Sequence, residues 1–258
     1  MFDSHCHLHD RRIEDADELL RRARVAGVTG VLLAGVDPEG WEVERALAKA
    51  HPDVAIAFGV HPQRIDELDQ SEADAMVRAL EPALLSGEAS AIGEIGLDGA
   101  ADRRASMARQ EAAFRAQLSI ARAHNLPVVL HILDAHARAL EILKRDGLPA
   151  AGGVLHSASA SAELMADYLK LGLHISFAGP VTNPDAKKTR RAAAVIPLHR
   201  LLVETDAPFQ TPLAYRPSQN EPAFLIAIVS ALAQIRGESE DLIATKTEEN
   251  ARRLFGKK

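Results

Sequence analysis

The chain of 258 residues has one cysteine, few aromatic residues and no long apolar run. Its single cysteine excludes an internal disulfide framework and suits a reducing compartment. Aromatic residues make up only 4% of the chain, which argues against a long base-stacking platform. No apolar run approaches the roughly 18 residues of a membrane span, and no signal-peptide pattern precedes Asp3. We therefore expect a cytoplasmic protein that does not contact a membrane.

Positive charge is also scarce. Lysine and arginine number 30 against 36 aspartates and glutamates, which gives a formal net charge of −6. That balance argues against a protein that grips nucleic acid through a broad basic surface. Linkers rich in proline, glycine and serine are absent, so no domain boundary is indicated. With 47% hydrophobic and 26% charged residues, the chain can bury a sizeable core.

Eight short apolar segments are present, and most are continuous rather than alternating, as in parallel strands covered by helices. They are residues 2–7, 28–36, 54–61, 91–98, 127–131, 153–157, 173–179 and 201–206. Helical patterns separate them. Gly27 ends a helix over 14–26, and Asn183 as N-cap begins one over 184–195. The last helix starts near Ser239 and runs to Leu254. The pattern predicts that residues 1–258 form one (β/α)₈ TIM barrel of the α/β class.

Four histidines and two acids stand at the ends of these segments. They are His5, His7, Glu94, His131, His156 and Asp206. The C-terminal strand ends form the active face of such a barrel, so these side chains can converge there as a two-metal hydrolase centre. Because side chains alternate along a strand, Cys6 points away from the histidines on either side and is expected to be a buried hydrophobe. His9 and His136 are expected to be solvated residues near this face.

Further motifs run through nearly the whole chain in a fixed order. They are HCH at residues 5–7, GVHP at 59–62, IGEIGLD at 92–98, LHS at 155–157 and VETDAP at 203–208, with TN at 182–183, YR at 215–216, NEP at 220–222 and NARRLF at 250–255. Together they resemble the TatD family of metal-dependent deoxyribonucleases, within the amidohydrolase superfamily. The resemblance implies two divalent metal ions. His5, His7 and Asp206 would bind one ion, His131 and His156 the other, and Glu94 would bridge both.

The sequence supports the bridging role of Glu94 in a second way. Many two-metal amidohydrolases use a carboxylated lysine as the bridge, but this chain has no lysine between Lys49 and Lys144. Two ions about 4 Å apart can deprotonate a bridging water and clamp a phosphoryl group for in-line attack. Asp206 would bind a metal and orient the water or accept its proton. Glu94 and Asp206 are thus candidate catalytic residues, and the ligand types admit Zn, Mg, Mn, Ni or Co.

Candidate substrate contacts follow from their positions near the active face. His61 ends the third segment and either donates a hydrogen bond to a phosphate or is structural. Arg216, after the last strand, is the preferred phosphate contact, and Asn183 as N-cap would place helix amides near an anion. The basic segment 187–191 is either a solvated helix face or a guide for a phosphate chain. We expect Glu204 to pair with a cation such as Arg216 rather than to hold a third ion.

The chain departs from the family pattern at positions that affect substrate rather than metal. The family commonly has an arginine where Leu133 stands, two residues after the histidine of the fifth strand. The motif HSFSGS reads HSASAS at residues 156–161, and GAA at 99–101 stands where tyrosines are frequent. Two stacking surfaces and one phosphate cation are therefore missing. Of the few aromatics, Tyr215, Phe209 and Phe177 are placed where they could stack on a base, and we expect Phe177 and Phe209 to pack in the core or at the rim.

We predict a metal-dependent hydrolase that cleaves DNA phosphodiester bonds with a metal-bridging hydroxide. It should hold DNA weakly and prefer single strands or ends that can enter a pocket. Two alternatives stay open: a hydrolase of another small ester or amide, including the aminoacyl ester of tRNA, and a non-catalytic metal-binding interaction protein. The sequence indicates no obligate protein partner.

Overall fold

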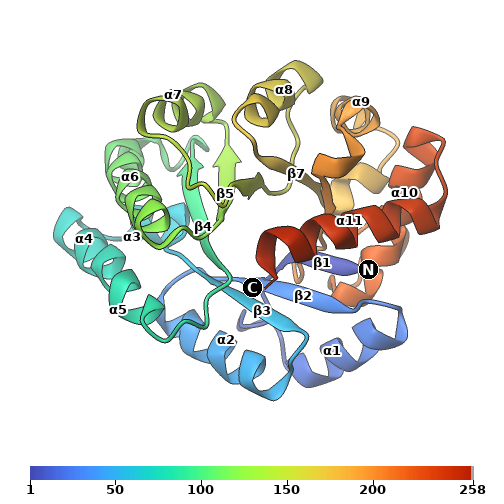
Figure 1. The fold of residues 1–258 in the computed structure, drawn as a ribbon, viewed down its shortest axis with the longest axis horizontal. Helices are drawn as coiled ribbons and strands as arrows, with labels where there is room; N and C mark the ends of the chain where they lie inside the picture. Colours follow the sequence, from blue (N-terminus) through green and yellow to red (C-terminus); the bar gives the residue numbers. More distant parts are fainter. Residues whose placement is uncertain (257–258) are drawn as a thin grey trace.

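Eight strands form one sheet in chain order in the computed structural model, which describes residues 1–256. The strands are β1 (Phe2–Cys6), β2 (Gly30–Ala34), β3 (Val54–Phe58), β4 (Ala91–Asp98), β5 (Val128–Leu133), β6 (Gly153–Leu155), β7 (His174–Phe177) and β8 (Leu201–Val203). Each strand pairs in parallel with the next one along the chain. Figure 1 shows helices surrounding these strands. The predicted (β/α)₈ barrel is confirmed.

Helices connect the strands and lie outside them. They are α1 (Ala16–Val25), α2 (Pro38–Ala50), α3 (Pro62–Glu67), α4 (Gln70–Arg78), α5 (Leu80–Leu84), α6 (Met107–His124), α7 (His136–Asp146), α8 (Ala162–Lys170), α9 (Lys187–Val195), α10 (Leu225–Arg236) and α11 (Glu240–Phe255). Several start where a side chain satisfies a free backbone amide. Asp15, Asp37 and Ser239 each accept a hydrogen bond from the first turn of the helix that follows.

The predicted start of the helix after β7 is wrong. α9 begins at Lys187, and its N-cap residue Ala186 has no capping side chain. Asn183 lies outside the helix, where its Oδ1 accepts a hydrogen bond from the backbone N–H of Asp185 at 2.9 Å. An asparagine can bond its own following backbone in this way instead of capping a helix. Asn183 therefore does not place helix amides at the rim of the barrel.

The two ends of the sheet join through β1 and the segment after β8. The buried carboxylate of Asp3 accepts hydrogen bonds from the backbone N–H and the hydroxyl of Thr205. The backbone N–H of Asp206 donates to the carbonyl of His5 at 2.9 Å. These contacts bring residues from opposite ends of the chain into register, so the position of Asp206 beside His5 is fixed by the closure of the barrel.

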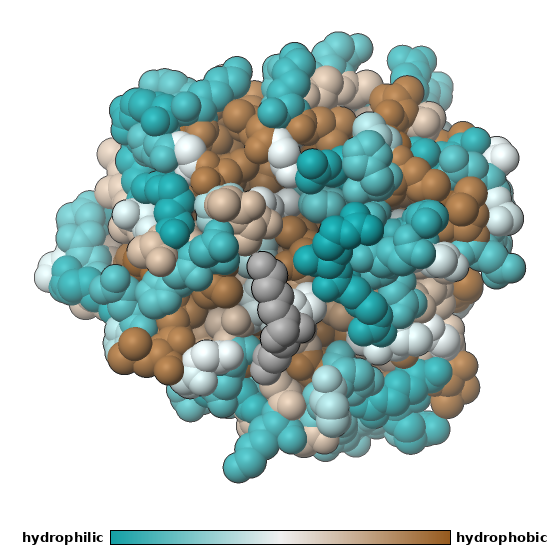
Figure 2. Space-filling view, in the orientation of Figure 1, coloured by the Kyte–Doolittle hydropathy of each residue, from teal (hydrophilic) through white to brown (hydrophobic). Residues whose placement is uncertain are grey.

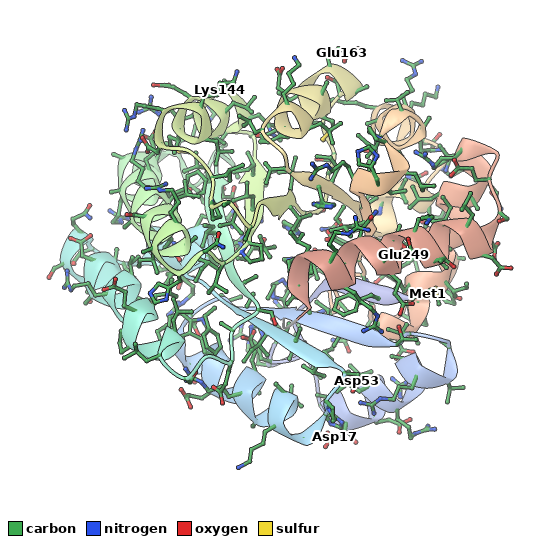
Figure 3. All side chains as sticks on the ribbon, viewed as in Figure 1. Met1, Asp17, Asp53, Lys144, Glu163 and Glu249 are labelled. Atoms are coloured by element: carbon green, nitrogen blue, oxygen red, sulfur yellow. The ribbon has the colours of Figure 1, made fainter. Side chains whose placement is uncertain are left out.

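The interior of the barrel is apolar at its N-terminal end. A cluster there consists of Phe2, Leu32, Ala57, Ala91, Val129, Val154, Leu202, Ala251 and Phe255. The last two belong to α11, which lies across the barrel in Figure 1. The side-chain amide of Asn250 donates to the carbonyls of Leu198 and Leu201, both at 2.9 Å. The N-terminus also pairs with Glu248 at 2.8 Å, and Figure 3 places Met1 beside this helix. α11 thus closes one end of the barrel.

The outer faces of the helices are mostly polar. Figure 2 shows hydrophilic side chains over much of the visible face, with hydrophobic residues between them. Figure 3 places Lys144 of α7 and Glu163 of α8 on the outside of the molecule. This distribution is typical of amphipathic helices that bury one stripe against a sheet. Among residues 1–256, no helix is both long and apolar enough to cross a membrane.

Replacing Asn250 by alanine should lower the free energy of unfolding by about 1–3 kcal/mol, because one buried and one partly buried carbonyl lose their hydrogen-bond donor. Urea unfolding followed by circular dichroism measures this change. The control is Glu249→Ala on the same helix, where only an exposed ion pair to Lys246 is lost and a change within about 0.5 kcal/mol is expected. Equal stability of the two variants would contradict the proposed role of Asn250.

Candidate metal centre

The structure brings together all six side chains that the sequence analysis selected as metal ligands. His5 lies in β1, Glu94 in β4 and His131 in β5, whereas His7, His156 and Asp206 follow the ends of β1, β6 and β8. Five of them line a cavity of about 470 Å³, and His5 lies fully buried behind them. The strands end earlier than predicted, so several of these side chains come from the first loop residues. Because α11 closes the opposite end, the cavity opens at the C-terminal ends of the strands.

One oxygen of the Glu94 carboxylate faces a first group of donors. Oε2 lies 3.3 Å from Nε2 of His5 and 3.4 Å from Nε2 of His7. The same two nitrogens lie 3.6 and 3.3 Å from Oδ1 of Asp206. We refer to His5, His7 and Asp206 as the Oε2 cluster. Their donor atoms lie within 4.8 Å of one another, a spacing at which three side chains can hold one metal ion.

The other oxygen of Glu94 faces a second group. Oε1 lies 2.7 Å from Nδ1 of His131, 2.7 Å from Nε2 of His156 and 3.4 Å from Nε2 of His61. We refer to these three histidines as the Oε1 cluster. His61 was predicted to be a substrate contact, and the structure places it among the candidate ligands. The sequence alone could not show that His131 presents Nδ1 to Glu94 while the other histidines present Nε2.

Hydrogen bonds on the outer side of the rings test whether cations fit between them. Nδ1 of His7 donates to the carbonyl of Ala34 at 2.9 Å, so the lone pair of its Nε2 points at Glu94. Nδ1 of His156 donates to Glu204 at 3.2 Å, and its Nε2 likewise points at Glu94. A lone pair that faces a carboxylate is repelled unless a proton or a metal ion lies between them. The donors therefore fit a cation on each side of Glu94.

The pKa shifts of Glu94 and His7 also indicate that the site favours positive charge. Burial raises the pKa of Glu94, but the charges of His156 and His61 outweigh it and hold that pKa well below its usual value. Burial lowers the pKa of His7, yet its hydrogen bond to Asp206 and the charge of Glu94 raise that pKa to about 9. The site binds protons strongly at a ligand nitrogen, and a metal ion would compete for the same lone pair.

The predicted partner of Glu204 is wrong. Glu204 is fully buried, as expected, but its Oε1 accepts hydrogen bonds from Nδ1 of His156 at 3.2 Å and from the backbone N–H of Ser157 at 2.6 Å. Arg216 is exposed, and its Nε donates to the carbonyl of Thr211 at 3.0 Å. Carboxylates commonly fix the tautomer and orientation of a metal-binding histidine in this way. Glu204 therefore orients the ring of His156.

His9 is another residue whose surroundings were not foreseen. It was expected to be solvated, but its side chain is only 9% exposed and its Nδ1 lies 2.9 Å from Oε1 of Glu44. Glu44 lies in α2 and is fully buried, and burial raises its pKa. The ring of His9 stands edge-on to that of His7, with centroids 5.6 Å apart. No pattern in the sequence connects Glu44 with a histidine of the first loop.

The basic residues at the cavity differ from those that the sequence suggested. Within the described part of the chain, neither Arg216 nor Asn183 lines the cavity, and neither do the cations of segment 187–191. Arg12 and Arg64 line it instead. Each follows an apolar segment that ends in a histidine on the active face. That position in the sequence was the available signal for Arg12 and Arg64, which were not predicted to lie at the cavity.

Both arginines at the cavity are already paired with acids. Arg12 donates to the two carboxylate oxygens of Asp10 at 3.1 and 2.9 Å, and its guanidinium lies 5.1 Å from the ring centre of Phe209. Arg64 lies 3.0 Å from Oδ2 of Asp37. Phe209 is 40% exposed and also lines the cavity. The rim therefore offers little unbalanced positive charge to a polyanion.

An eight-stranded barrel with these side chains at its C-terminal face defines a metal-dependent hydrolase. The family described as TatD related DNase matches residues 2–256, and the chain belongs to that family. The metal-dependent hydrolase YabD of Bacillus subtilis (strain 168) is 34% identical over 257 residues, which cover 99% of this chain and 98% of YabD.

Two further relatives extend the comparison. The 3'-5' ssDNA/RNA exonuclease TatD of Pantoea vagans (strain C9-1) is 37% identical over 247 residues, 93% of each chain. The crystal structure of YjjV, a TatD homolog from Escherichia coli K12, has 32% sequence identity and a TM-score of 0.92. The match covers 100% of this chain and 98% of YjjV. The similarity therefore includes the whole barrel rather than a shared motif.

Proposed function

We propose that this hydrolase cleaves phosphodiester bonds in DNA, at flexible single strands or ends, with two divalent metal ions bound on either side of Glu94. The observation that carries the proposal is the buried Glu94 carboxylate, because each of its oxygens faces a separate group of imidazole nitrogens. A carboxylate between two cations has this geometry. Relatives named as nucleases support the choice of nucleic acid as substrate.

The proposed ligands divide between the two oxygens of the bridge. His5, His7 and Asp206 would hold one ion, His131 and His156 the other, and Glu94 both. When bound, the two ions supply Lewis-acid activation of water and of the phosphoryl group. Imidazole and carboxylate donors admit Zn, Mg, Mn, Ni or Co.

Asp206 is the proposed acceptor of the proton of the attacking water. Its Oδ2 accepts a hydrogen bond from Nε2 of Gln210, while Oδ1 faces His5 and His7. Burial raises the pKa of Asp206, but its hydrogen bond to His7 and the charge of His5 lower it below the usual value. The carboxylate is thus ionised and oriented toward the cavity, as a general base must be.

His61 is the proposed donor to a phosphoryl oxygen. Its Nδ1 accepts a hydrogen bond from the backbone N–H of Gln63 at 3.1 Å, so the neutral ring carries its proton on Nε2. Burial lowers the pKa of His61 to about 4, which keeps the ring neutral near pH 7. Since Nε2 is the nitrogen that faces the cluster, His61 can donate there without being charged.

The substrate would be held mainly at the scissile group. The paired state of Arg12 and Arg64 supports weak binding of a long polyanion. Arg216 is exposed on the loop after β8, where we propose that it contacts a phosphate outside the cavity. A contact of Asn183 with substrate stays a prediction. Cys6 is buried, as predicted, and a cytoplasmic location for the enzyme stays a prediction.

A panel of substrates tests this proposal. The metal-supplemented protein is incubated with single- and double-stranded DNA, RNA and small esters, and we expect the highest kcat/KM for DNA on single strands. Hydrolysis of a small ester or amide alone would favour that alternative substrate class. Protein that binds metal and turns over no substrate would instead be a metal-binding interaction protein.

Glu94→Ala should abolish hydrolysis and lower the metal content below two ions per chain, because both clusters lose the carboxylate that they share. Metal analysis, circular dichroism and turnover of bis(p-nitrophenyl) phosphate measure the three effects. Glu163→Ala, on the outer side of α8, is the control and should retain activity and metal. A Glu94 variant with two ions and full turnover would reject the bridge.

Glu204→Gln should reduce the affinity for metal by roughly tenfold to a hundredfold, because the amide no longer attracts the N–H of His156 with a full negative charge. The shape is retained, so the barrel should stay folded. Competition of the loaded protein with a chelator measures the affinity. An unchanged affinity would show that the contact between Glu204 and His156 does not tune the ligand.

Leu133→Arg should lower the KM for single-stranded DNA by roughly tenfold to a hundredfold, since a charge-assisted bond to phosphate is worth about 1.5–3 kcal/mol. Leu133 lies at the end of β5, is 40% exposed and lines the cavity, so a longer side chain has room to turn toward substrate. Leu133→Met is the neutral control. The gain should fall as salt is added, and a gain that is insensitive to salt would contradict a phosphate contact.

A further inference from the structure

A second cavity of about 240 Å³ adjoins the metal site. Leu133, Ser157, Ser159 and Gln210 line both this cavity and the one that contains the candidate ligands. The two spaces therefore share a wall of side chains from the end of β5 and from the loops after β6 and β8. We call the smaller one the side pocket.

Small apolar residues give the side pocket its volume. Ala158, Ala178 and Pro180 line it. Ala158 follows Ser157 and lies two residues after the candidate ligand His156. A phenyl ring on the same backbone would occupy space that the alanine leaves free. The side pocket is thus a consequence of this chain's own sequence at a point next to the metal site.

Polar groups at the edge of the side pocket are held in place. The hydroxyl of Ser157 and the side-chain amide of Gln210 lie 2.7–2.9 Å apart, and the same amide donates to Asp206. Gln210 has a left-handed φ of +54°, and its carbonyl packs so closely on Gly179 that a Cβ there would come within 1.7 Å of it. A residue fixed in this conformation is often part of a functional site. Gln210 therefore joins the side pocket to a candidate ligand in a defined geometry.

We infer that the side pocket is a specificity subsite for the nucleobase next to the scissile phosphodiester bond, an inference that rests on the proposed cleavage of DNA. Its volume lies below the roughly 300–1,000 Å³ of pockets for drug-sized ligands, so it suits a single ring system. The apolar walls match the faces of a base. Ser157, Thr189 and Gln210 supply hydroxyl and amide groups for its edges.

The experiment uses the metal-loaded protein and three substrates: thymidylyl-thymidine and two analogues, each of which lacks one base. We expect kcat/KM to fall by roughly tenfold or more for one analogue and much less for the other, because only one base enters the side pocket. Removing a base leaves the phosphodiester and the metal contacts unchanged. The comparison therefore measures the subsite rather than the hydrolytic centre.

Ala158→Phe fills the side pocket and should lower kcat/KM for thymidylyl-thymidine by about the same factor. The rate on the sensitive analogue should stay within about twofold, because it has no base to exclude. Glu163→Ala, on the outer side of α8, is the control, with little change expected on any substrate. Metal content and circular dichroism are measured for both variants, so that loss of folding or of metal is detected separately from loss of the subsite.

A measurement on the unaltered protein avoids any effect of the substitution on folding. Thymidine monophosphate should inhibit about tenfold more strongly than deoxyribose 5-phosphate, which lacks the base. Equal inhibition, together with equal cleavage of all three dinucleotides, would overturn the subsite and leave the proposed function intact. Hydrolysis of a small ester without cleavage of any DNA substrate would overturn the proposed function and the subsite together.

Discussion

A buried carboxylate surrounded by imidazole nitrogens is the constraint on which the functional end of this barrel depends. Glu94 is 1% exposed, and burying an ionised carboxylate is costly unless cations or hydrogen-bond donors surround it. The five nearest imidazoles belong to His5, His7, His61, His131 and His156, which come from four different strands or the loops after them. Only a closed barrel brings those strand ends around one point. The site therefore forms only when the barrel closes. The contacts that join Asp3 to Thr205 in this closure also place Asp206 beside the first strand.

The N-terminal end of the barrel contributes mainly to stability, and the C-terminal end carries the candidate metal site. At the N-terminal end, apolar side chains fill the interior and α11 covers it. Asn250 of this helix donates hydrogen bonds to carbonyls at and just before the start of β8. At the C-terminal end acids and histidines lie at ion-pair distances, and His5 and His7 approach to 3.0 Å between their Nε2 atoms. Burying such a cluster lowers the free energy of unfolding unless cations neutralise it. Apolar packing at the other end of the barrel offsets this loss of stability. Metal binding should for that reason stabilise the fold as well as create the site.

The sequence predicts the barrel and the six candidate ligand positions because both depend on local patterns. Continuous apolar runs mark buried parallel strands, and a histidine or acid at the end of such a run has one face of the barrel to occupy. Contacts between distant elements leave no such mark. The pairing of Glu204 with His156 and of His9 with Glu44 depends on packing, and the choice of Nδ1 in His131 depends on the path of its strand. The start of α9 was mispredicted because Asn183 can cap a helix or close a turn with the same local sequence.

The charges around the cavity indicate how recognition is distributed along a substrate. Arg12 and Arg64 already neutralise acids at the rim, so each added phosphate outside the cavity gains little attraction from them. Affinity must then come from the group that reaches Glu94 and from what lies directly beside it. Gln210 links these two regions, because one amide contacts both Asp206 and the serine at the edge of the side pocket. A shift of the nucleobase in the side pocket would therefore change the orientation of Asp206, the proposed general base. In such a site selectivity arises near the bond that breaks, and the length of the chain beyond it contributes little.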